Sequence, residues 1–452
     1  MSKRINRFLL LLIACVLAIA GLLVKHSSGA LGPQRATVSS PTSRNAAVVA
    51  TTAAVLKETS EIRELPILRP VKSGAQSRAD IERMLIKNLD EQTTPAEMHA
   101  NELSLRKFGL APSDFEYRPF VIKLLTEQVA GYYDPRAQEF HLADWLELEG
   151  QKPVMAHELT HALQDQHFNL RRFEKWPHGD SDAELAAHAL IEGDATLAMT
   201  IYLAKNPMVA LAFSRSLSSS GMSSEQFNKA PRALRESLVF PYLQGNEWAT
   251  QLYKRGGWTM VSKAFARLPL SSEQILHPEK YFSYERPVKV MLPDLSGLLN
   301  KSEPSGLKSG SARVGNWRRI DYDVNGEWSY YLILDQFLKS PAESRRAAAG
   351  WAGDRFELYE GPGPENIFIA QMTVWDTEND AREFFDAYVK RTERRYPDAR
   401  LMKLSSSGPG ERRAWQTSEG AVIMELRGLR VLIIEGVPEG IDPNRLMKSI
   451  WP

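Results

Sequence analysis

The chain has 452 residues, of which 43% are apolar and 25% are charged. A chain of this length and composition can bury a large core and predicts two globular domains. Its formal net charge is +1 and it carries no basic block. This excludes nucleic acid as a main partner, because there is no cluster of cations to neutralise phosphates.

The N-terminus predicts export. Residues 1–7 are basic, and residues 8–24 form an uninterrupted stretch of apolar or small side chains. This pattern is typical of a signal peptide or a membrane anchor within residues 1–30, with a cleavage site expected at residues 28–30. Both alternatives stay open because the stretch is at the lower limit for crossing a bilayer. We expect an exported protein, secreted or anchored in the cell envelope, whose only cysteine, Cys15, forms no disulfide.

The next segments predict a linker and then a globular body. Residues 31–60 are rich in Ala, Ser, Thr and Val and predict a flexible linker. The body is expected over residues 61–285 and opens with helices at residues 79–89 and 97–108. Ser113 and Glu116 form a capping-box pattern that predicts the start of another helix. A turn at Asp134-Pro135 then predicts a hairpin of two short strands.

The most informative motif is His-Glu-Leu-Thr-His at residues 157–161. Two histidines four positions apart on a helix project from one face, so His157 and His161 can bind one divalent metal ion. Glu158 then lies close to the metal, where it can accept a proton from a water molecule. Pro153 predicts the first turn of this helix, which is expected to be half buried. Asp165 either orients a ligand histidine or is a solvated carboxylate.

A catalytic zinc site needs a third protein ligand. Residues 181–205 predict one long helix, capped by Ser181 or Asp182. Glu192 lies in its apolar middle, where a bare carboxylate is costly unless it is paired or bound to metal. His188, one turn earlier on the same face, is either the third ligand instead or, more in keeping with its position, a structural histidine.

Two neighbours of Glu192 predict how its helix packs. Gly193 is small enough to let this helix approach the motif helix closely. Asp194 points about 200° away from Glu192. We therefore expect Asp194 to be a partner for another element and not a ligand.

The motif and the downstream glutamate resemble the gluzincins, the metallopeptidase group typified by thermolysin, over residues 110–285. The resemblance implies a mainly helical zincin-like domain with a small sheet. It implies zinc bound by His157, His161 and Glu192, with Glu158 as general base. It also implies that an edge strand of the hairpin pairs with an extended substrate; a purely structural hairpin is the alternative.

The chain departs from thermolysin in two ways. Its spacing between the last motif histidine and the ligand glutamate is longer. Thr196 stands four positions after that glutamate, where thermolysin relatives carry an aspartate that supports a ligand histidine. The chain is thus similar to a divergent bacterial zinc metallopeptidase.

Two more residues are candidates for stabilising an oxyanion. Pro278 breaks any helix and predicts that His277 lies in a loop, from which it can reach a cleft. A histidine or tyrosine facing the metal would stabilise a tetrahedral intermediate. We expect His277 first and Tyr281 second in this role. The alternative is a capping or surface histidine.

The last third of the chain predicts a separate domain. Residues 286–318 predict a linker, and residues 319–452 a smaller α+β domain. Helices are expected at residues 327–338, 342–349 and 378–395, and strands at residues 355–359 and 367–375. Residues 421–426 and 430–435 predict a hairpin. No cluster of catalytic residue types occurs here, so we expect a scaffold, a substrate-positioning module or a partner-binding module.

The predicted function is zinc-dependent hydrolysis of peptide bonds in a peptide or protein substrate. The fold class is α+β, with the metallopeptidase-like domain followed by the smaller domain. One alternative is a non-catalytic envelope protein with a structural or vestigial zinc site, and another is a chance motif in a binding protein. Glu158 favours catalysis, since a structural site needs no base beside the metal. The sequence gives no indication of the oligomeric state.

Overall fold

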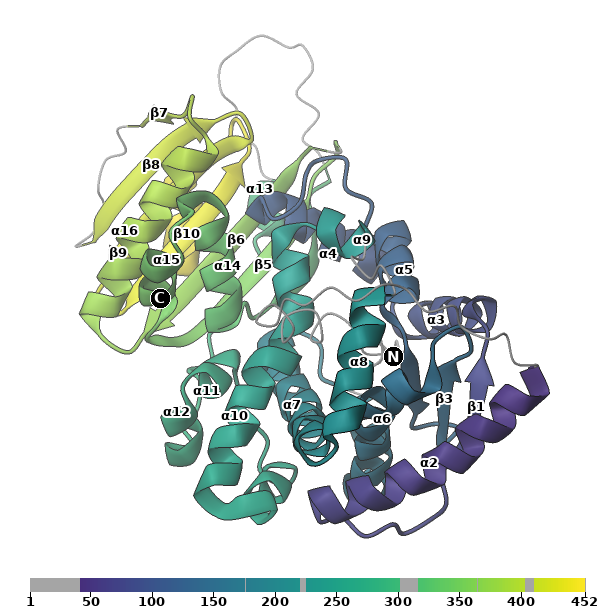
Figure 1. Ribbon diagram of the computed structural model, residues 1–452. Coiled ribbons are helices and arrows are strands. Elements are labelled where there is room, and N and C mark those ends of the chain that lie inside the picture. The colour runs from purple at the N-terminus through teal and green to yellow at the C-terminus, as the bar shows by residue number, and fades with distance from the viewer. Residues whose placement is uncertain are drawn as a thin grey trace.

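The computed structural model describes residues 41–174, 176–219, 225–300, 316–363, 365–402 and 410–451. A mainly helical N-terminal part contains a three-stranded sheet at its edge, and a C-terminal part is built on a seven-stranded sheet (Figure 1). The mixed α+β class with one small sheet is therefore confirmed. The predicted export segment and residues 31–40 of the predicted linker lie outside the described residues.

The structure begins with a helix where the sequence predicts a flexible linker. In α2 (Pro41–Arg63), the buried residues Val48, Thr52, Val55 and Thr59 recur every three or four positions. This spacing places them on one helix face. The helix packs against α6 (Leu148–Phe168) and α7 (Ser181–Lys205). The linker prediction is wrong from residue 41, because these side chains are buried rather than solvated.

The small sheet has the strand order β1-β3-β2. Its strands are β1 (Lys72–Gln76), β2 (Gly131–Asp134) and β3 (Glu139–Ala143). β2 and β3 form the predicted antiparallel hairpin, with Tyr133 opposite Phe140, and β3 runs parallel to β1. β2 is thus an edge strand. Pairing between the hairpin and an extended substrate, which the sequence predicts, requires such a strand.

Three helices follow along the chain between β1 and β2: α3 (Arg78–Gln92), α4 (Pro95–Phe108) and α5 (Tyr117–Gln128). α3 and α5 pack against the small sheet, whereas α4 contacts the C-terminal part at β4 (Arg318–Asp323) and β6 (Ile367–Trp375). α3 and α4 confirm the predicted helices. The capping box predicted at Ser113 does not form. α5 starts after Glu116, which makes no side-chain capping hydrogen bond.

The helices that carry the predicted metal ligands, α6 and α7, differ in part from their predictions. α7 has the predicted range, but Asp180 caps it by accepting a hydrogen bond from the Ala183 N–H. α6 begins before Pro153, which lies inside the helix rather than in its first turn. α6 is buried nearly all round from Gly150 to Asp165, and not on one face as expected. Such a helix belongs to the centre of the core.

α7 makes its closest approach to α10 (Arg232–Ala264), not to α6. A Cβ on Gly193 would lie 2.2 Å from the backbone of Gly245, and a Cβ on Gly245 would lie 2.2 Å from the Ala189 carbonyl oxygen. The small size of Gly193 is therefore needed at a different helix crossing from the one predicted. α10 is broken at Gly256 and Gly257, which have non-helical backbone angles.

Shorter elements complete the N-terminal part. They are the 3-10 turn at Leu170–Glu174, α8 (Pro207–Ser219), α9 (Glu225–Lys229), α11 (Ser272–Leu276) and α12 (Pro278–Ser283). Among the described helices, none alone is long and apolar enough to cross a membrane. α7 and most of α8 meet that test only as a pair bent by 113°.

The large sheet has the order β4-β5-β6-β10-β9-β8-β7 and is antiparallel. Its strands are β4 (Arg318–Asp323), β5 (Trp351–Glu360), β6 (Ile367–Trp375), β7 (Arg400–Leu401), β8 (Glu411–Thr417), β9 (Gly420–Arg427) and β10 (Arg430–Val437). The predicted hairpin of residues 421–426 and 430–435 is confirmed as β9 and β10.

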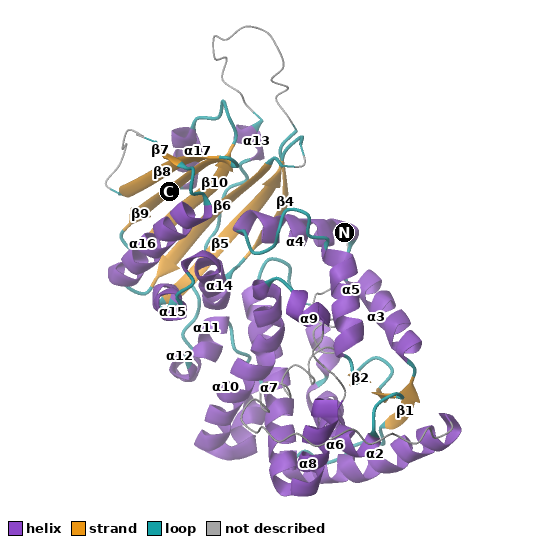
Figure 2. Cartoon of the chain, turned by 45° about the horizontal axis from the view of Figure 1, so that its top comes forward, coloured by secondary structure: helices purple, strands orange, loops and turns teal. Residues whose placement is uncertain are grey.

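Helices cover both faces of this sheet (Figure 2). α14 (Gly326–Leu338), α15 (Pro341–Ala348) and α16 (Glu378–Arg395) lie on one side, and α13 (Ser296–Leu299) and α17 (Pro443–Ile450) on the other. Along β10, Val431 and Ile433 join the first side while Leu432 and Ile434 join the second. This alternation is that of a strand buried on both faces.

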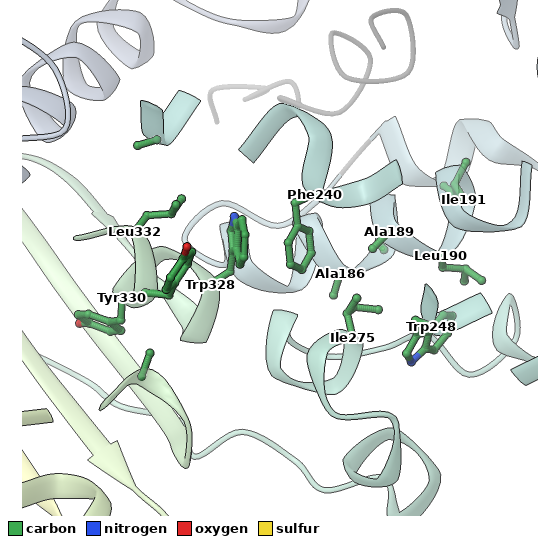
Figure 3. Packing of buried hydrophobic residues seen from close by; sticks show 14 of the residues in the cluster. Ala186, Ala189, Leu190, Ile191, Phe240, Trp248, Ile275, Trp328, Tyr330 and Leu332 are labelled. Atoms are coloured by element: carbon green, nitrogen blue, oxygen red, sulfur yellow. The ribbon is translucent and has the colours of Figure 1, made fainter. Parts of the chain in front are cut away.

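One hydrophobic cluster runs through both parts. Phe240 of α10 lies between Trp328 of α14 and Ala186 of α7 (Figure 3). The segment predicted as a linker also touches the C-terminal part, since the Val288 N–H donates to the Ala352 carbonyl at 2.7 Å. Residues 301–315 of that segment lie outside the described residues.

Candidate metal centre

Three side chains converge inside the N-terminal part. His157 Nε2 lies 3.1 Å from His161 Nε2, and Glu192 Oε2 lies 3.0 Å from the first and 3.4 Å from the second. A tetrahedral ion with metal–nitrogen bonds of about 2.0–2.1 Å would hold its donor atoms about 3.3 Å apart. The three donor atoms therefore already have the separation that one metal ion requires.

The unpaired atoms of the triad fit a metal as well. Each triad side chain is at most 3% exposed. Within the described part of the chain, Glu192 Oε1 and His157 Nδ1 have no hydrogen-bond partner. A buried carboxylate with an unpaired oxygen is costly unless a positive charge lies nearby. A divalent ion bound at Oε2 would supply that charge.

The predicted alternative ligand, His188, is buried on α7 but does not belong to this group. A second acidic group, Glu273, Glu285 and Asp376, also converges. Its centre is filled by the ammonium of Lys280, whose Nζ lies 2.7 Å from Glu273 and 2.9 Å from Glu285. A bound lysine already neutralises these carboxylates, so we assign no metal to them.

Glu158 connects the triad to the edge strand. The Tyr133 N–H, which points away from β3, donates to Glu158 Oε2 at 3.0 Å. Burial raises the pKa of Glu158 to about 8, against the opposing effect of His161. This pKa applies to the site without metal, where it favours the protonated carboxyl group. A cation bound to the triad would favour the ionised form, which is the form that can accept a proton.

The pKa values of the triad describe its state without metal. Burial lowers the pKa of His161, but the charge of Glu192 outweighs it and the pKa rises to about 9. Burial raises the pKa of Glu192, but both histidines outweigh it and the pKa falls to about 2. The pKa of His157 is lowered by burial. Without metal, the site therefore holds a protonated His161 beside an ionised Glu192.

A buried chain of hydrogen bonds supports His161. Its Nδ1 faces Gln164 Oε1 at 2.9 Å, while Gln164 Nε2 donates to Asp194 Oδ2 at 2.9 Å. Arg63 Nε donates to Asp194 Oδ1 at 2.5 Å, and both side chains are fully buried. Asp194 is therefore a partner for another element, as predicted. That element is α2, where the sequence predicts a linker.

Asp165 does not contact either motif histidine through any hydrogen bond in the described structure. Its Oδ2 accepts hydrogen bonds from Arg69 at 2.8 Å and from the Tyr133 hydroxyl at 3.0 Å. Its Oδ1 accepts one from the Leu170 N–H. Asp165 therefore neither orients a ligand histidine nor is solvated, and both predicted roles are wrong. It is buried and connects the C-terminal end of α6 to the edge strand β2 through the Tyr133 hydroxyl.

Sequence reasoning missed Tyr242 of α10. Its ring stacks on His157, with the ring centroids 6.0 Å apart and an interplanar angle of 27°. Tyr242 is buried and lies in the cluster that also contains Tyr132 of the edge strand. No signal in the sequence connects this tyrosine to the motif, because the contact depends on how α10 packs across α7.

The structure does not bring His277 and Tyr281 to the triad. His277 Nε2 lies 2.9 Å from Glu327 Oε1, on a cavity whose described lining contains no triad residue. The Tyr281 hydroxyl donates to the Arg267 carbonyl at 2.9 Å, and its ring packs on Trp248. Both residues have partners elsewhere, so the oxyanion role predicted for them has no support in these contacts.

The metal centre is closed to solvent. Glu158 and the three triad residues are all 1–2% exposed. None of them lines the cavity between α10, α11, α12, α14 and α15. In the described structure, these four side chains are therefore buried among the elements packed around them, which include β2 and α10.

Comparison with known proteins gives a family for the C-terminal part only. A family described as "Domain of unknown function (DUF8575)" matches residues 313–446. No curated protein and no solved structure matches the chain. The matched region contains the seven-stranded sheet and does not include the metal centre.

Proposed function

We propose that the protein is a zinc metallopeptidase of the gluzincin type, with a zincin-like N-terminal part. The observation that carries this proposal is the convergence of His157, His161 and Glu192 at metal-ligand separations beside Glu158. Two histidines and a glutamate form a donor set used by catalytic zinc, which leaves a position for water. We extend the proposal to a peptide or protein substrate and to export through residues 1–30.

Zinc bound there would polarise a carbonyl group and lower the pKa of water toward 7. Glu158 accepts the proton of the attacking water and passes it to the leaving amine. The Tyr133 N–H holds the Glu158 carboxylate in place. Since Tyr133 belongs to the edge strand, a peptide that pairs with β2 would pass directly beside this base.

The closure of the site favours one rival function, a non-catalytic protein with a structural or vestigial zinc site. A structural zinc is enclosed by its ligands and stabilises the fold. The rival gives no reason for a buried carboxyl group at Glu158, whose burial is unfavourable while it is ionised. The two functions therefore differ in what Glu158 does.

The test combines metal removal with peptide cleavage. We expect the purified chain to bind about one zinc ion, to cleave a peptide library, and to lose cleavage when a chelator removes the zinc. Cleavage should return when zinc is added back. The matched variants are Glu192→Ala, which should lose zinc, and Glu82→Ala, an exposed glutamate of α3 that should not. Bound zinc without any cleavage would support the structural rival, and absence of zinc would refute both.

A further inference from the structure

A cavity of about 760 Å³ lies away from the candidate metal centre, between α10, α11, α12, α14 and α15. Its wall on α10 includes Gln244, Glu247 and Gln251. These residues lie about 140–200° around the helix from Tyr242, which stacks on the metal ligand His157. The cavity and the metal centre are therefore on opposite faces of α10.

Two arginines on this cavity are stacked on aromatic rings. The guanidinium carbon of Arg255 lies 4.0 Å from the ring centroid of Phe282, and that of Arg345 lies 4.7 Å from the ring centroid of Tyr331. Within the described ranges, neither arginine has a carboxylate within salt-bridge distance. Stacking holds a guanidinium flat and leaves its edge N–H groups available for a planar anion such as a carboxylate.

His277, which also lines the cavity, is positioned by a contact with a buried glutamate. His277 Nε2 lies 2.9 Å from Glu327 Oε1, and the Glu327 side chain is only 7% exposed. The hydrogen bond to Glu327 raises the pKa of His277 and favours its charged form, although burial opposes this. Glu279 Oε1 lies 3.8 Å from His277 Nδ1, too far for a hydrogen bond. His277 thus adds a third donor to the wall.

The charges around the cavity nearly cancel. The lining contains the cations Arg255, Arg345 and Arg346 and the histidine His277, against the carboxylates of Glu247, Glu279 and Glu327. With His277 protonated the excess is one positive charge, which is too small for a polyanion such as a nucleotide. The lining suits a ligand with one carboxylate and neutral or cationic groups elsewhere, and aromatic rings provide apolar walls for its side chains.

We propose that this cavity is a binding site for the free C-terminal carboxylate of a short peptide, anchored by Arg255 and Arg345. The proposal is independent of the metallopeptidase function, because no cavity residue belongs to the metal centre. Trp328, Phe282 and Tyr331 would contact the last side chains of the peptide. A free amino acid carries the same carboxylate, so the test must separate the two sources.

The test is calorimetric titration of the full chain carrying Glu158→Gln, which prevents consumption of the probe. The probes are N-acetyl-Ala-Ala-Phe with a free carboxylate, its C-terminal amide, and free phenylalanine. We expect the peptide acid to bind at least tenfold more tightly than the amide and than free phenylalanine. Arg255→Gln and Arg345→Gln should each remove the difference between acid and amide.

The matched control is Lys254→Gln, an exposed cation of α10 that does not line the cavity. It should bind the acid like the parent chain, and circular dichroism should show that all variants are folded. Equal affinity for acid and amide in the parent chain would overturn the proposal, as would unchanged discrimination in both arginine variants. Equally tight binding of phenylalanine would overturn the assignment to peptides.

Discussion

Gln164 Oε1 accepts a hydrogen bond from His161 Nδ1 at 2.9 Å. The direction of this hydrogen bond follows from the partners of the amide nitrogen. Gln164 Nε2 faces two acceptors, the Ile191 carbonyl at 3.0 Å and Asp194 Oδ2 at 2.9 Å. The amide oxygen must then face His161, so Nδ1 carries the proton. The lone pair of the neutral ring is left on Nε2, the atom that points to the other two candidate ligands.

This arrangement predicts that Gln164→Leu weakens zinc binding. Loss of the group that orients a ligand histidine typically costs about 10- to 100-fold in metal affinity. The measurement is competition against a chromophoric zinc chelator. Gln166→Leu is the matched control, since Gln166 lies on the same helix but hydrogen-bonds residues 68 and 69. Equal loss of affinity in both variants would show that the helix, not the amide, is responsible.

The buried ion pair between Arg63 and Asp194, which ends the hydrogen-bond chain from His161 through Gln164, should contribute to the stability of the fold. Arg63→Met leaves Asp194 fully buried without its cation, which should cost about 3–5 kcal/mol of unfolding free energy. Arg69→Met removes the partially exposed cation of Asp165 and should cost about 1 kcal/mol or less. Urea unfolding of both variants checks this. A small effect of Arg63→Met would mean that α2 is not part of the folded core.

The crossing of α7 and α10 should not tolerate a methyl group. Replacing a helical glycine with alanine normally stabilises a helix by about 1 kcal/mol. At Gly193, however, the added Cβ would lie 2.2 Å from the Gly245 backbone, which cannot move without separating the helices. Gly193→Ala should therefore destabilise the protein by about 1–3 kcal/mol or more. In Gly297→Ala, within α13, the new Cβ meets nothing within 4 Å, so this variant should unfold at the same temperature as the parent chain or at a higher one.

Zinc affinity should rise with pH. The pKa of His161 is raised to about 9 in the metal-free site, so a proton occupies the ligand at neutral pH and must leave when metal binds. Release of one proton makes the affinity rise about tenfold per pH unit between about pH 6.5 and 8. Chelator competition across this range measures the slope. An affinity independent of pH would show that His161 is already neutral or is not a ligand.

How far the sequence predicts the site depends on the range of the interactions. The two motif histidines are one turn apart on a helix, so their convergence follows from local geometry. The prediction of Glu192 as their partner rested on its burial in an apolar helix, and the structure brings it to them. No pattern in the sequence shows whether His277 and Tyr281 reach the motif, because such contacts depend on how distant helices pack. The contact between Tyr242 and His157 cannot be predicted from the sequence for the same reason.

The fold shows the same limit. Helices with strong apolar periodicity and caps, such as residues 378–395, were predicted closely. The sequence does not predict α2 because its buried residues include Thr52, Thr59 and Arg63, which a hydropathy pattern counts as polar. Thr52 satisfies its hydroxyl by donating to the Val48 carbonyl of the same helix at 2.8 Å, so its burial costs little. Such residues signal a helix only through their spacing.

The most direct test of the proposed function is the cleavage rate of Glu158→Gln relative to the parent chain at equal zinc occupancy. The substitution keeps the size of the side chain and leaves all three proposed ligands unchanged. If Glu158 is the general base, zinc content stays the same and the rate constant for peptide cleavage falls by about 10²- to 10⁴-fold. A variant that binds zinc and cleaves as fast as the parent chain would contradict the proposed mechanism.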